Sequence, residues 1–184
     1  MKEYFKKMRG GGKNPHEVSF TEIIWSGIGS FLGILVCGYL SFKYFTPKDM
    51  TLFIGSFGAS AVLIYGAIKS PLAQPRNLIG GHIFSAVIGV AAYKIFNNHM
   101  WLAAGVAVAT AIALMHATKT LHPPGGATAL IAVIGGQQIH NLGYLYAIIP
   151  AGLGAMIMLV IALFINNIPK NRKYPGPGIL RRLV

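Results

Sequence analysis

Charged residues are scarce in this sequence, and they are missing from long stretches of it. Only 11% of its 184 residues are Asp, Glu, Lys or Arg, whereas soluble domains average about 25%. Between Thr120 and Pro169 a run of 50 residues contains none of the four. A helix of about 20 apolar residues is long enough to cross the hydrocarbon core of a bilayer, which is about 30 Å thick. We therefore expect an all-α polytopic membrane protein rather than a soluble domain.

Other absences argue against several classes of function. The single cysteine, Cys37, allows no disulfide within the chain, and the sequence contains neither a GxSxG nucleophile motif nor a Walker phosphate-binding loop. Only 4 carboxylates are present, and none follows Asp49. Proton pumps and cation transporters usually carry Asp or Glu within the membrane, so they fit poorly. We expect no enzymatic activity, no metal and no other cofactor.

The basic residues are distributed unevenly along the chain. The formal net charge is +12, which in a soluble protein would suggest nucleic acid, but in membrane proteins Lys and Arg collect on the cytoplasmic side near anionic lipids. If six apolar stretches cross the membrane from an inside N-terminus, 13 of the 16 basic residues are cytoplasmic. Lys43, Lys48 and Lys94 are then outside. We expect both termini in the cytoplasm, lipids rather than nucleic acid as partners, and a multi-pass location in the cell membrane, specifically a bacterial inner membrane.

The apolar residues form about six segments. They lie near 20–42, 51–68, 78–96, 100–117, 127–136 and 142–168. The fifth would measure only about 15 Å as a helix, half of the hydrocarbon thickness, so we expect a half-helix or a re-entrant segment there. Irregular backbone next to it must be covered by protein or face a water-filled cavity. The prediction is four to five full spans, with the remainder short and broken.

A short repeat divides the chain into two similar halves. The sequence GASAVLI at 58–64 resembles GATALIA at 126–132, 68 residues later, and each copy lies between two other apolar segments. Three segments per half would insert the second half in the opposite sense. Such 3+3 inverted repeats are common in transporters, whose sites lie where interrupted segments meet. The predicted domains are basic tails at 1–19 and 169–184 and a transmembrane domain at 20–168, with repeat units at 20–97 and 100–168.

Each half also contains a polar break that combines basic residues with proline. The breaks are KSPLAQPRN at 69–77 and KTLHPPGG at 119–126. Together with their surroundings, SPLAQPRNLIGGHIFSAVIGV and MHATKTLHPPGGATALIAV, they resemble the HPP family of integral membrane proteins. This resemblance covers 20–168 and implies a multi-pass transport protein, with plastid and cyanobacterial relatives associated with nitrite transport.

The second break combines several features of an anion site. A helix that begins after the prolines presents its first N–H groups and the positive end of its dipole, and glycines there leave the amides accessible. His122 could donate a hydrogen bond to an anion, or protonate a weak-acid anion so that it crosses as a neutral species. The predicted substrate-binding residues are His122, Pro123, Pro124, Gly125, Gly126, Thr128, Lys119, Gln74, Arg76, Asn77, His82, Gly58 and Ser60.

Structural interpretations of these residues stay open. The basic side chains could bind lipid phosphate, and His122 could cap the turn before the helix. His82 could be a hydrogen-bonding residue between helices, and Gln74 and Asn77 could satisfy the backbone of the first break. A metal site has little support, because His116 and His122 lack a helical ligand spacing.

The sequence therefore favours a transporter or channel for a small monovalent anion, with nitrite as the preferred substrate. It does not separate a channel from a proton-coupled carrier. Alternatives are a pore for a neutral or weak-base solute such as water or ammonia, and a membrane anchor or sensor for a partner protein. Gly29 and Gly33 form a GxxxG pattern that predicts close helix packing, either within the chain or in a homo-oligomer.

Overall fold

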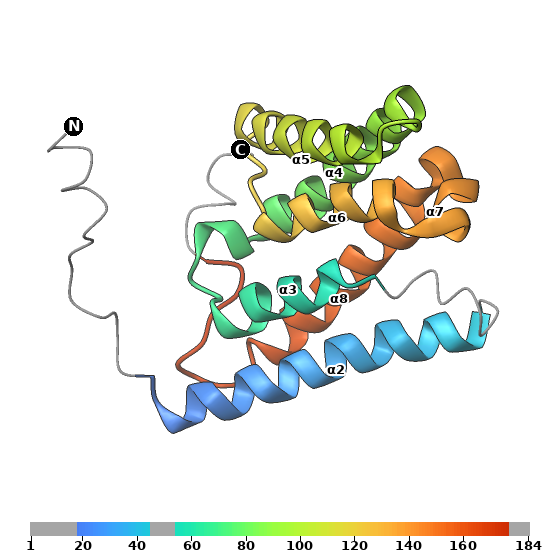
Figure 1. Ribbon diagram of the computed structural model, residues 1–184. Helices are drawn as coiled ribbons and strands as arrows, with labels where there is room; N and C mark the ends of the chain where they lie inside the picture. The colour runs from blue at the N-terminus through green and yellow to red at the C-terminus, as the bar shows by residue number, and fades with distance from the viewer. Residues whose placement is uncertain (1–17, 45–53, 177–184) are drawn as a thin grey trace, which may run out of the picture.

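The computed structural model describes residues 18–44 and 54–176, and all regular structure in these ranges is helical (Figure 1). Four helical stretches are long and apolar enough to cross a membrane: α2 (Phe20–Tyr44), α4 (Pro75–Phe96), α5 (Met100–Ala117) and the run Gly136–Ile165, which is kinked at Ile149, where the backbone is extended (φ −131°, ψ 119°). That run comprises α7 (Gly136–Leu142), η3 (Gly143–Ala147), η4 (Ile148–Gly152) and α8 (Leu153–Ile165). The predicted all-helical, polytopic architecture is confirmed.

Two further apolar helices are too short to cross a bilayer. The first is α3 (Ser56–Ala61), which continues directly as η1 (Val62–Gly66), and the second is α6 (Pro123–Ile134). The 12 residues of α6 measure about 18 Å, well short of the hydrocarbon thickness. The prediction that the fifth segment is short is confirmed, although its helix begins at Pro123 rather than at Ala127. The second segment is also short, because its described helix covers only 56–66.

Proline sets the starts of α4 and α6. Pro75 opens α4, while Pro123 and Pro124 open α6, at positions where a missing N–H costs no helical hydrogen bond. His122, just before α6, is extended with φ −139° and ψ 104°, as the following proline requires. Lys119 has a φ of 56°, so the chain turns from α5 toward α6 through a left-handed residue. A 3₁₀ turn, η2 (Pro71–Ala73), precedes α4 in the first break.

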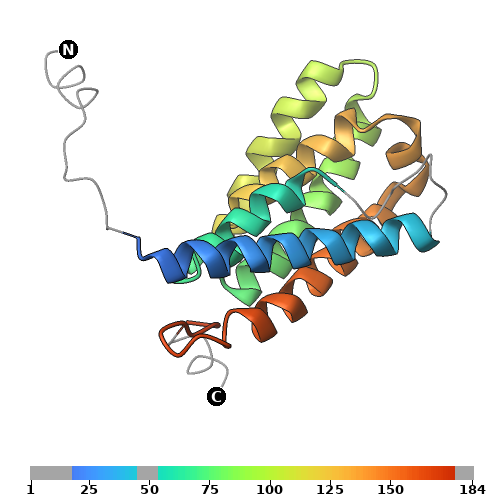
Figure 2. The ribbon, with the colours of Figure 1, turned by 90° about the horizontal axis from the view of Figure 1, so that it is seen from below.

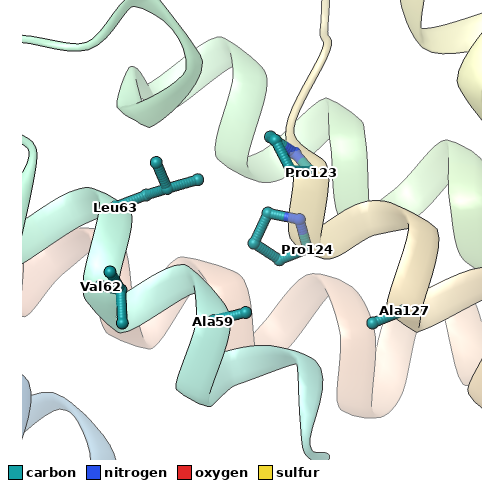
Figure 3. A pocket seen from close by; sticks show the side chains of 6 residues that line it. All are labelled: Ala59, Val62, Leu63, Pro123, Pro124 and Ala127. Carbon is teal, nitrogen blue, oxygen red and sulfur yellow. The ribbon is translucent and has the colours of Figure 1, made fainter. Parts of the chain in front are cut away.

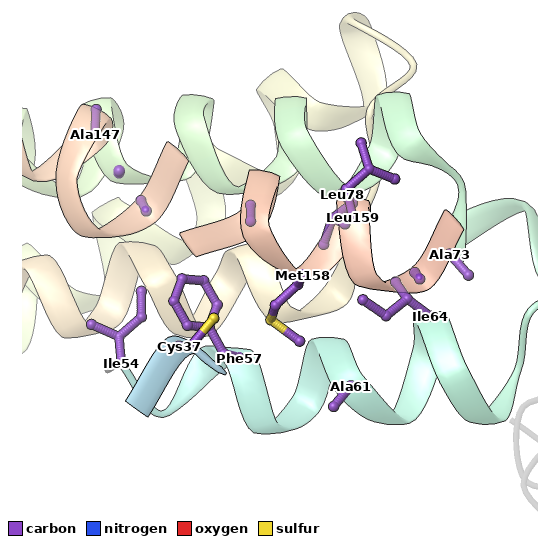
Figure 4. Close-up of a cluster of buried hydrophobic side chains, with 14 of the residues drawn as sticks. Cys37, Ile54, Phe57, Ala61, Ile64, Ala73, Leu78, Ala147, Met158 and Leu159 are labelled. Atoms are coloured by element: carbon purple, nitrogen blue, oxygen red, sulfur yellow. The ribbon is translucent and has the colours of Figure 1, made fainter. Parts of the chain in front are cut away.

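The helices form a bundle in which α4 packs against both α5 and α6 (Figure 1). The long helix α2 lies against α8 and η1, as the view in Figure 2 also shows. The short helices α3 and α6 pack against each other. A cluster of buried apolar side chains that includes Phe57, Leu78 and Met158 joins α3, α4 and α8 (Figure 4). One face of each short helix is therefore buried against the other helices, while residues such as Val62 and Ile134 on the other face stay exposed.

Glycines allow aromatic rings to approach two of the long helices closely. A Cβ atom on Gly29 would lie 2.6 Å from Tyr65 Cδ1, and one on Gly33 would clash with the same ring. Gly154 in α8 leaves the corresponding space for the ring of Phe57. The GxxxG pattern of α2 therefore serves packing within the chain, while large apolar side chains cover much of the outward face of this helix.

The segment after α8, which the sequence assigns to a basic tail, folds back onto the end of η1. Arg172 is buried and donates to the carbonyl of Tyr65 and to Asn166 Oδ1 at 3.0 Å. Asn166 Nδ2 donates to the carbonyl of Ile64 at 2.8 Å. These donors satisfy carbonyls at the C-terminal end of η1 that have no helical partner. Burial lowers the pKa of the Arg172 guanidinium, and Glu22, 3.8 Å away, partly offsets this effect.

Candidate functional site

The two polar breaks lie side by side. Arg76 Nη2 in the first break donates to the carbonyl of Thr118 at 2.7 Å, and His122 Nδ1 lies 2.8 Å from the carbonyl oxygen of Leu72. Because a carbonyl oxygen can only accept, Nδ1 of His122 must carry a hydrogen. The structure thus joins two motifs that the sequence places about 50 residues apart.

His82 of α4 is the centre of a buried polar cluster. Its Nε2 atom lies 2.8 Å from Ser60 Oγ of α3, and its Nδ1 atom lies 2.7 Å from Thr128 Oγ1 of α6. Ser60 and Thr128 occupy the same position in GASAVLI and GATALIA, the two copies of the repeated sequence. Each short helix therefore presents a hydroxyl group to one of the two nitrogens of a single imidazole ring. None of the three side chains is exposed.

His122 extends this cluster toward the first break. Its Nε2 atom lies 2.9 Å from Ser60 Oγ, so one hydroxyl group bridges both histidines. The two ring centroids are 5.2 Å apart, and Phe57 lies edge-on to His82 at 5.3 Å between centroids. We call Ser60, His82, His122 and Thr128 the histidine cluster; all four are fully buried.

The surroundings of the histidine cluster carry no formal charge. Thr128 Oγ1 lies 2.9 Å from Ser56 Oγ, and the hydroxyl group of Tyr146 donates to the Thr128 carbonyl at 3.1 Å. In residues 18–44 and 54–176, no Asp, Glu, Lys or Arg side chain forms a hydrogen bond or ion pair with the cluster. Among these residues no three His, Cys, Asp or Glu side chains gather into a metal-binding group. The cluster can therefore donate and accept hydrogen bonds without a fixed counter-charge.

Two predicted site residues in the first break bond to the backbone. Gln74 is buried and donates to the carbonyls of Ile68 at 3.0 Å and Ser70 at 2.8 Å. Asn77 donates to the carbonyl of Leu121 at 2.8 Å. Their contacts fit the structural alternative, in which they hold the breaks in shape. Arg76, Lys119 and Gly58 are exposed, and none of the three bonds to the histidine cluster.

The amides at the start of α6 are mostly occupied or absent. The helix begins with two prolines, which have no N–H. Gly125 donates its N–H to the carbonyl of His122 at 2.8 Å and faces α4, where an added Cβ would lie 2.8 Å from the carbonyl oxygen of Gly81. Among the first three residues of α6, only Gly125 therefore has an N–H group, and this group already donates to the His122 carbonyl.

An open groove lies between α3–η1 and α6, and no residue of the histidine cluster lines it (Figure 3). Its volume is about 390 Å³ and its lining is almost wholly apolar. The lining residues are Ala59, Val62, Leu63, Pro123, Pro124 and Ala127. The two prolines of the second break thus contribute to an apolar surface, while the neighbouring His122 points into the bundle.

Three participants in the site were not predicted from the sequence. Ser56 precedes Ser60 by four residues, so helical spacing would have placed both on one face. Leu72 contributes only its backbone carbonyl, and Tyr146 comes from an apolar segment without a motif. For these two no local signal in the sequence exists.

Comparison with known proteins covers nearly the whole chain. The family model for the HPP transmembrane region matches residues 15–175. Two proteins of Dictyostelium discoideum, each named a transmembrane protein, are 48% identical over 176 residues and 46% identical over 178 residues. Each match covers 94% of this chain but only 56% and 62% of the respective relative, so the chain spans less than two thirds of their length. No solved structure matches the chain. The chain belongs to the HPP transmembrane region family of multi-pass membrane proteins.

Proposed function

We propose that this protein is a transporter or channel for a small monovalent anion, with nitrite as the preferred substrate. The histidine cluster is the observation that carries this proposal, because it gathers hydrogen-bond donors from three helices in a chain with no carboxylate after Asp49. A desolvated anion needs such donors, and a nearby carboxylate would repel it. The choice of nitrite follows the resemblance to nitrite-associated relatives.

The proposed site lies where the two halves of the chain meet. Each half has the order long, short, long: α2, α3–η1 and α4 in the first, then α5, α6 and the run from α7 to α8. Ser60 and Thr128, at equivalent positions of the two short helices, both bond to His82. These features support an inverted repeat with both termini on the cytoplasmic side of the cell membrane, and interrupted segments at such an interface are a common transport site.

A second candidate is a pore for a neutral or weak-base solute such as ammonia or water. One observation favours it: none of the three basic residues of the breaks, Lys69, Arg76 and Lys119, forms a hydrogen bond with the histidine cluster. Arg76 donates to the carbonyl of Thr118 instead, and Lys119 is exposed. A site that binds an uncharged solute requires no cation within it.

Uptake into liposomes that contain the purified protein separates the two candidates. We expect saturable uptake of nitrite, compared with nitrate, formate, chloride and ammonium, and a slower rate in Lys119→Gln and Arg76→Gln because both changes weaken attraction of anions to the breaks. Lys94→Gln, the same loss of charge at an exposed position near the opposite end of α4 from the first break, is the control. Transport of ammonium or water alone, insensitive to Lys119→Gln and Arg76→Gln, would overturn the anion proposal in favour of the second candidate.

A further inference from the structure

The directions of the hydrogen bonds in the histidine cluster follow from one bond whose donor is certain, the bond from His122 Nδ1 to the Leu72 carbonyl. His122 Nδ1 must donate to the Leu72 carbonyl, so in neutral His122 the Nε2 atom is an acceptor. Ser60 has a single hydroxyl hydrogen and must donate it to that atom. The Ser60 oxygen then accepts from His82 Nε2, which leaves His82 Nδ1 to accept from Thr128. One carbonyl group therefore assigns the tautomers of both rings.

With the atoms in the same positions, all hydrogen bonds of the cluster can also form when it carries one additional proton. A protonated His122 donates from both nitrogens, so Ser60 reverses and donates to His82 Nε2. His82 then donates from Nδ1 to Thr128 Oγ1. Thr128 in turn donates to Ser56 Oγ at 2.9 Å or to the Pro124 carbonyl at 3.3 Å. Within the four residues of the cluster, each donor has an acceptor in either arrangement, and the two arrangements differ by one proton and by three reversed hydrogen bonds. The hydrogen bond from Thr128 to Ser56 Oγ belongs to the protonated arrangement, because in the neutral one Thr128 gives its single hydrogen to His82.

We propose that Thr128, His82, Ser60 and His122 form a proton relay between the start of α3 and the first break, and that it couples transport to proton movement. A proton that binds the Thr128 oxygen sends the hydroxyl proton of Thr128 to His82 Nδ1. The Nε2 proton of His82 passes to Ser60, whose own proton passes to His122 Nε2. Each broken O–H or N–H bond is replaced by a new one, and the excess charge ends on His122.

When the hydrogen bond between His122 Nδ1 and the Leu72 carbonyl opens, the Nδ1 proton passes to water or to the substrate anion, and this release completes the transfer. Reorientation of the hydroxyl groups and rings restores the first arrangement. This inference rests on the proposed function, because it takes the histidine cluster as the transport site. It adds the co-substrate, a proton, and the route that the proton follows.

The groups that face the relay allow one additional proton and no more. The relay contacts Ser56 and Phe57 of α3 and Tyr146 of η3. Apart from the two histidines, Tyr146 is the titratable side chain among the described contacts of the relay. No carboxylate can neutralise a second charge, since none follows Asp49 and none among the described residues bonds to the cluster. Two imidazolium rings 5.2 Å apart would repel each other in this buried setting.

Proton movement into liposomes with an entrapped pH-sensitive dye tests the relay. Ser60→Ala removes the bridging hydroxyl and leaves both histidines, whereas Ser60→Thr retains a hydroxyl. Ser85→Ala is the matched control, because Ser85 is also buried and its one described bond goes to Met115 Sδ at 3.6 Å. We expect proton flux to fall about tenfold or more in Ser60→Ala, and to persist in Ser60→Thr and Ser85→Ala. Wild-type proton flux in folded Ser60→Ala would overturn the relay.

A spectroscopic measurement on the unaltered protein avoids any dependence on folding of the variants. Nitrogen-15 NMR of labelled histidines at alkaline pH should show His122 as the Nδ1–H tautomer and His82 as the Nε2–H tautomer. The opposite tautomer at either ring would overturn the assigned directions. Failure of the relay and failure of the proposed function are distinct outcomes. Anion uptake without proton movement would refute the relay and leave anion transport standing. Proton movement without anion uptake would refute anion transport and leave the proton route standing.

Discussion

Gly125 and Gly126 are neighbours in the sequence, yet the structure predicts that an added methyl group destabilises the protein at Gly125 and has little effect at Gly126. A Cβ atom at Gly125 would lie 2.8 Å from the carbonyl oxygen of Gly81, 2.8 Å from Ser85 Oγ and 2.9 Å from Met115 Sδ. The first of these atoms belongs to the backbone of α4 and cannot move without displacing that helix. At Gly126 the nearest atom would be Val108 Cγ1, at an ordinary distance of 3.9 Å.

We therefore expect Gly125→Ala to lower the free energy of unfolding by about 2 kcal/mol, within the range of about 1–3 kcal/mol for overpacking. Gly126→Ala should stay within about 0.5 kcal/mol of wild type, as substitutions without clashes usually do. The assay is unfolding by sodium dodecyl sulfate in mild-detergent micelles, followed by helical circular dichroism. Equal stabilities of the two variants would refute the close packing of α4 against α6. If instead both stay folded and both lose anion uptake, the amides of α6 bind the substrate after all.

Three further predictions concern other parts of the bundle. Arg172→Met should lower the free energy of unfolding by about 1–3 kcal/mol, because it leaves the buried Asn166 Oδ1 without a donor and the Tyr65 carbonyl with only the Ser26 hydroxyl. Lys173→Met, at an exposed position, should not; equal stability of the two variants would refute this role. Gly29→Ala should destabilise α2 packing by about 1–3 kcal/mol, while Gly27→Ala, with nothing within 4 Å of the new methyl group, should be neutral. Cys37, with 0% exposure, should react with N-ethylmaleimide only after unfolding; rapid labelling of the folded protein would contradict its burial.

Local patterns in the sequence were enough to predict several parts of the site. The repeated heptapeptide identified Ser60 and Thr128 as equivalent residues, and the prolines marked the two breaks, although α4 and α6 begin at these prolines and not after them. His122 stood out because it directly precedes those prolines. Each of these inferences depends on a few adjacent residues and on backbone chemistry that acts locally, so no knowledge of the tertiary fold was required.

Other parts of the site depend on contacts that no local pattern encodes. The sequence left two interpretations open for Gln74 and Asn77, and only the fold shows that carbonyls of the breaks lie within their reach. His82 of α4 is central because Ser60 of α3 lies next to one of its ring nitrogens and Thr128 of α6 lies next to the other. The Leu72 carbonyl, which fixes the tautomer of His122, is a backbone group without side-chain identity.

Nitrite influx in the Thr128→Val variant tests most directly whether the histidine cluster is the transport site. Valine has the shape of threonine but lacks the hydroxyl group that lies 2.7 Å from His82 Nδ1. Thr110→Val, at an exposed position of α5, is the matched control. We predict that the initial rate per reconstituted molecule falls about tenfold or more in Thr128→Val, since one buried hydrogen bond is worth about 1–3 kcal/mol, and is unchanged in Thr110→Val. Wild-type influx in correctly folded Thr128→Val would contradict a transport site at the cluster.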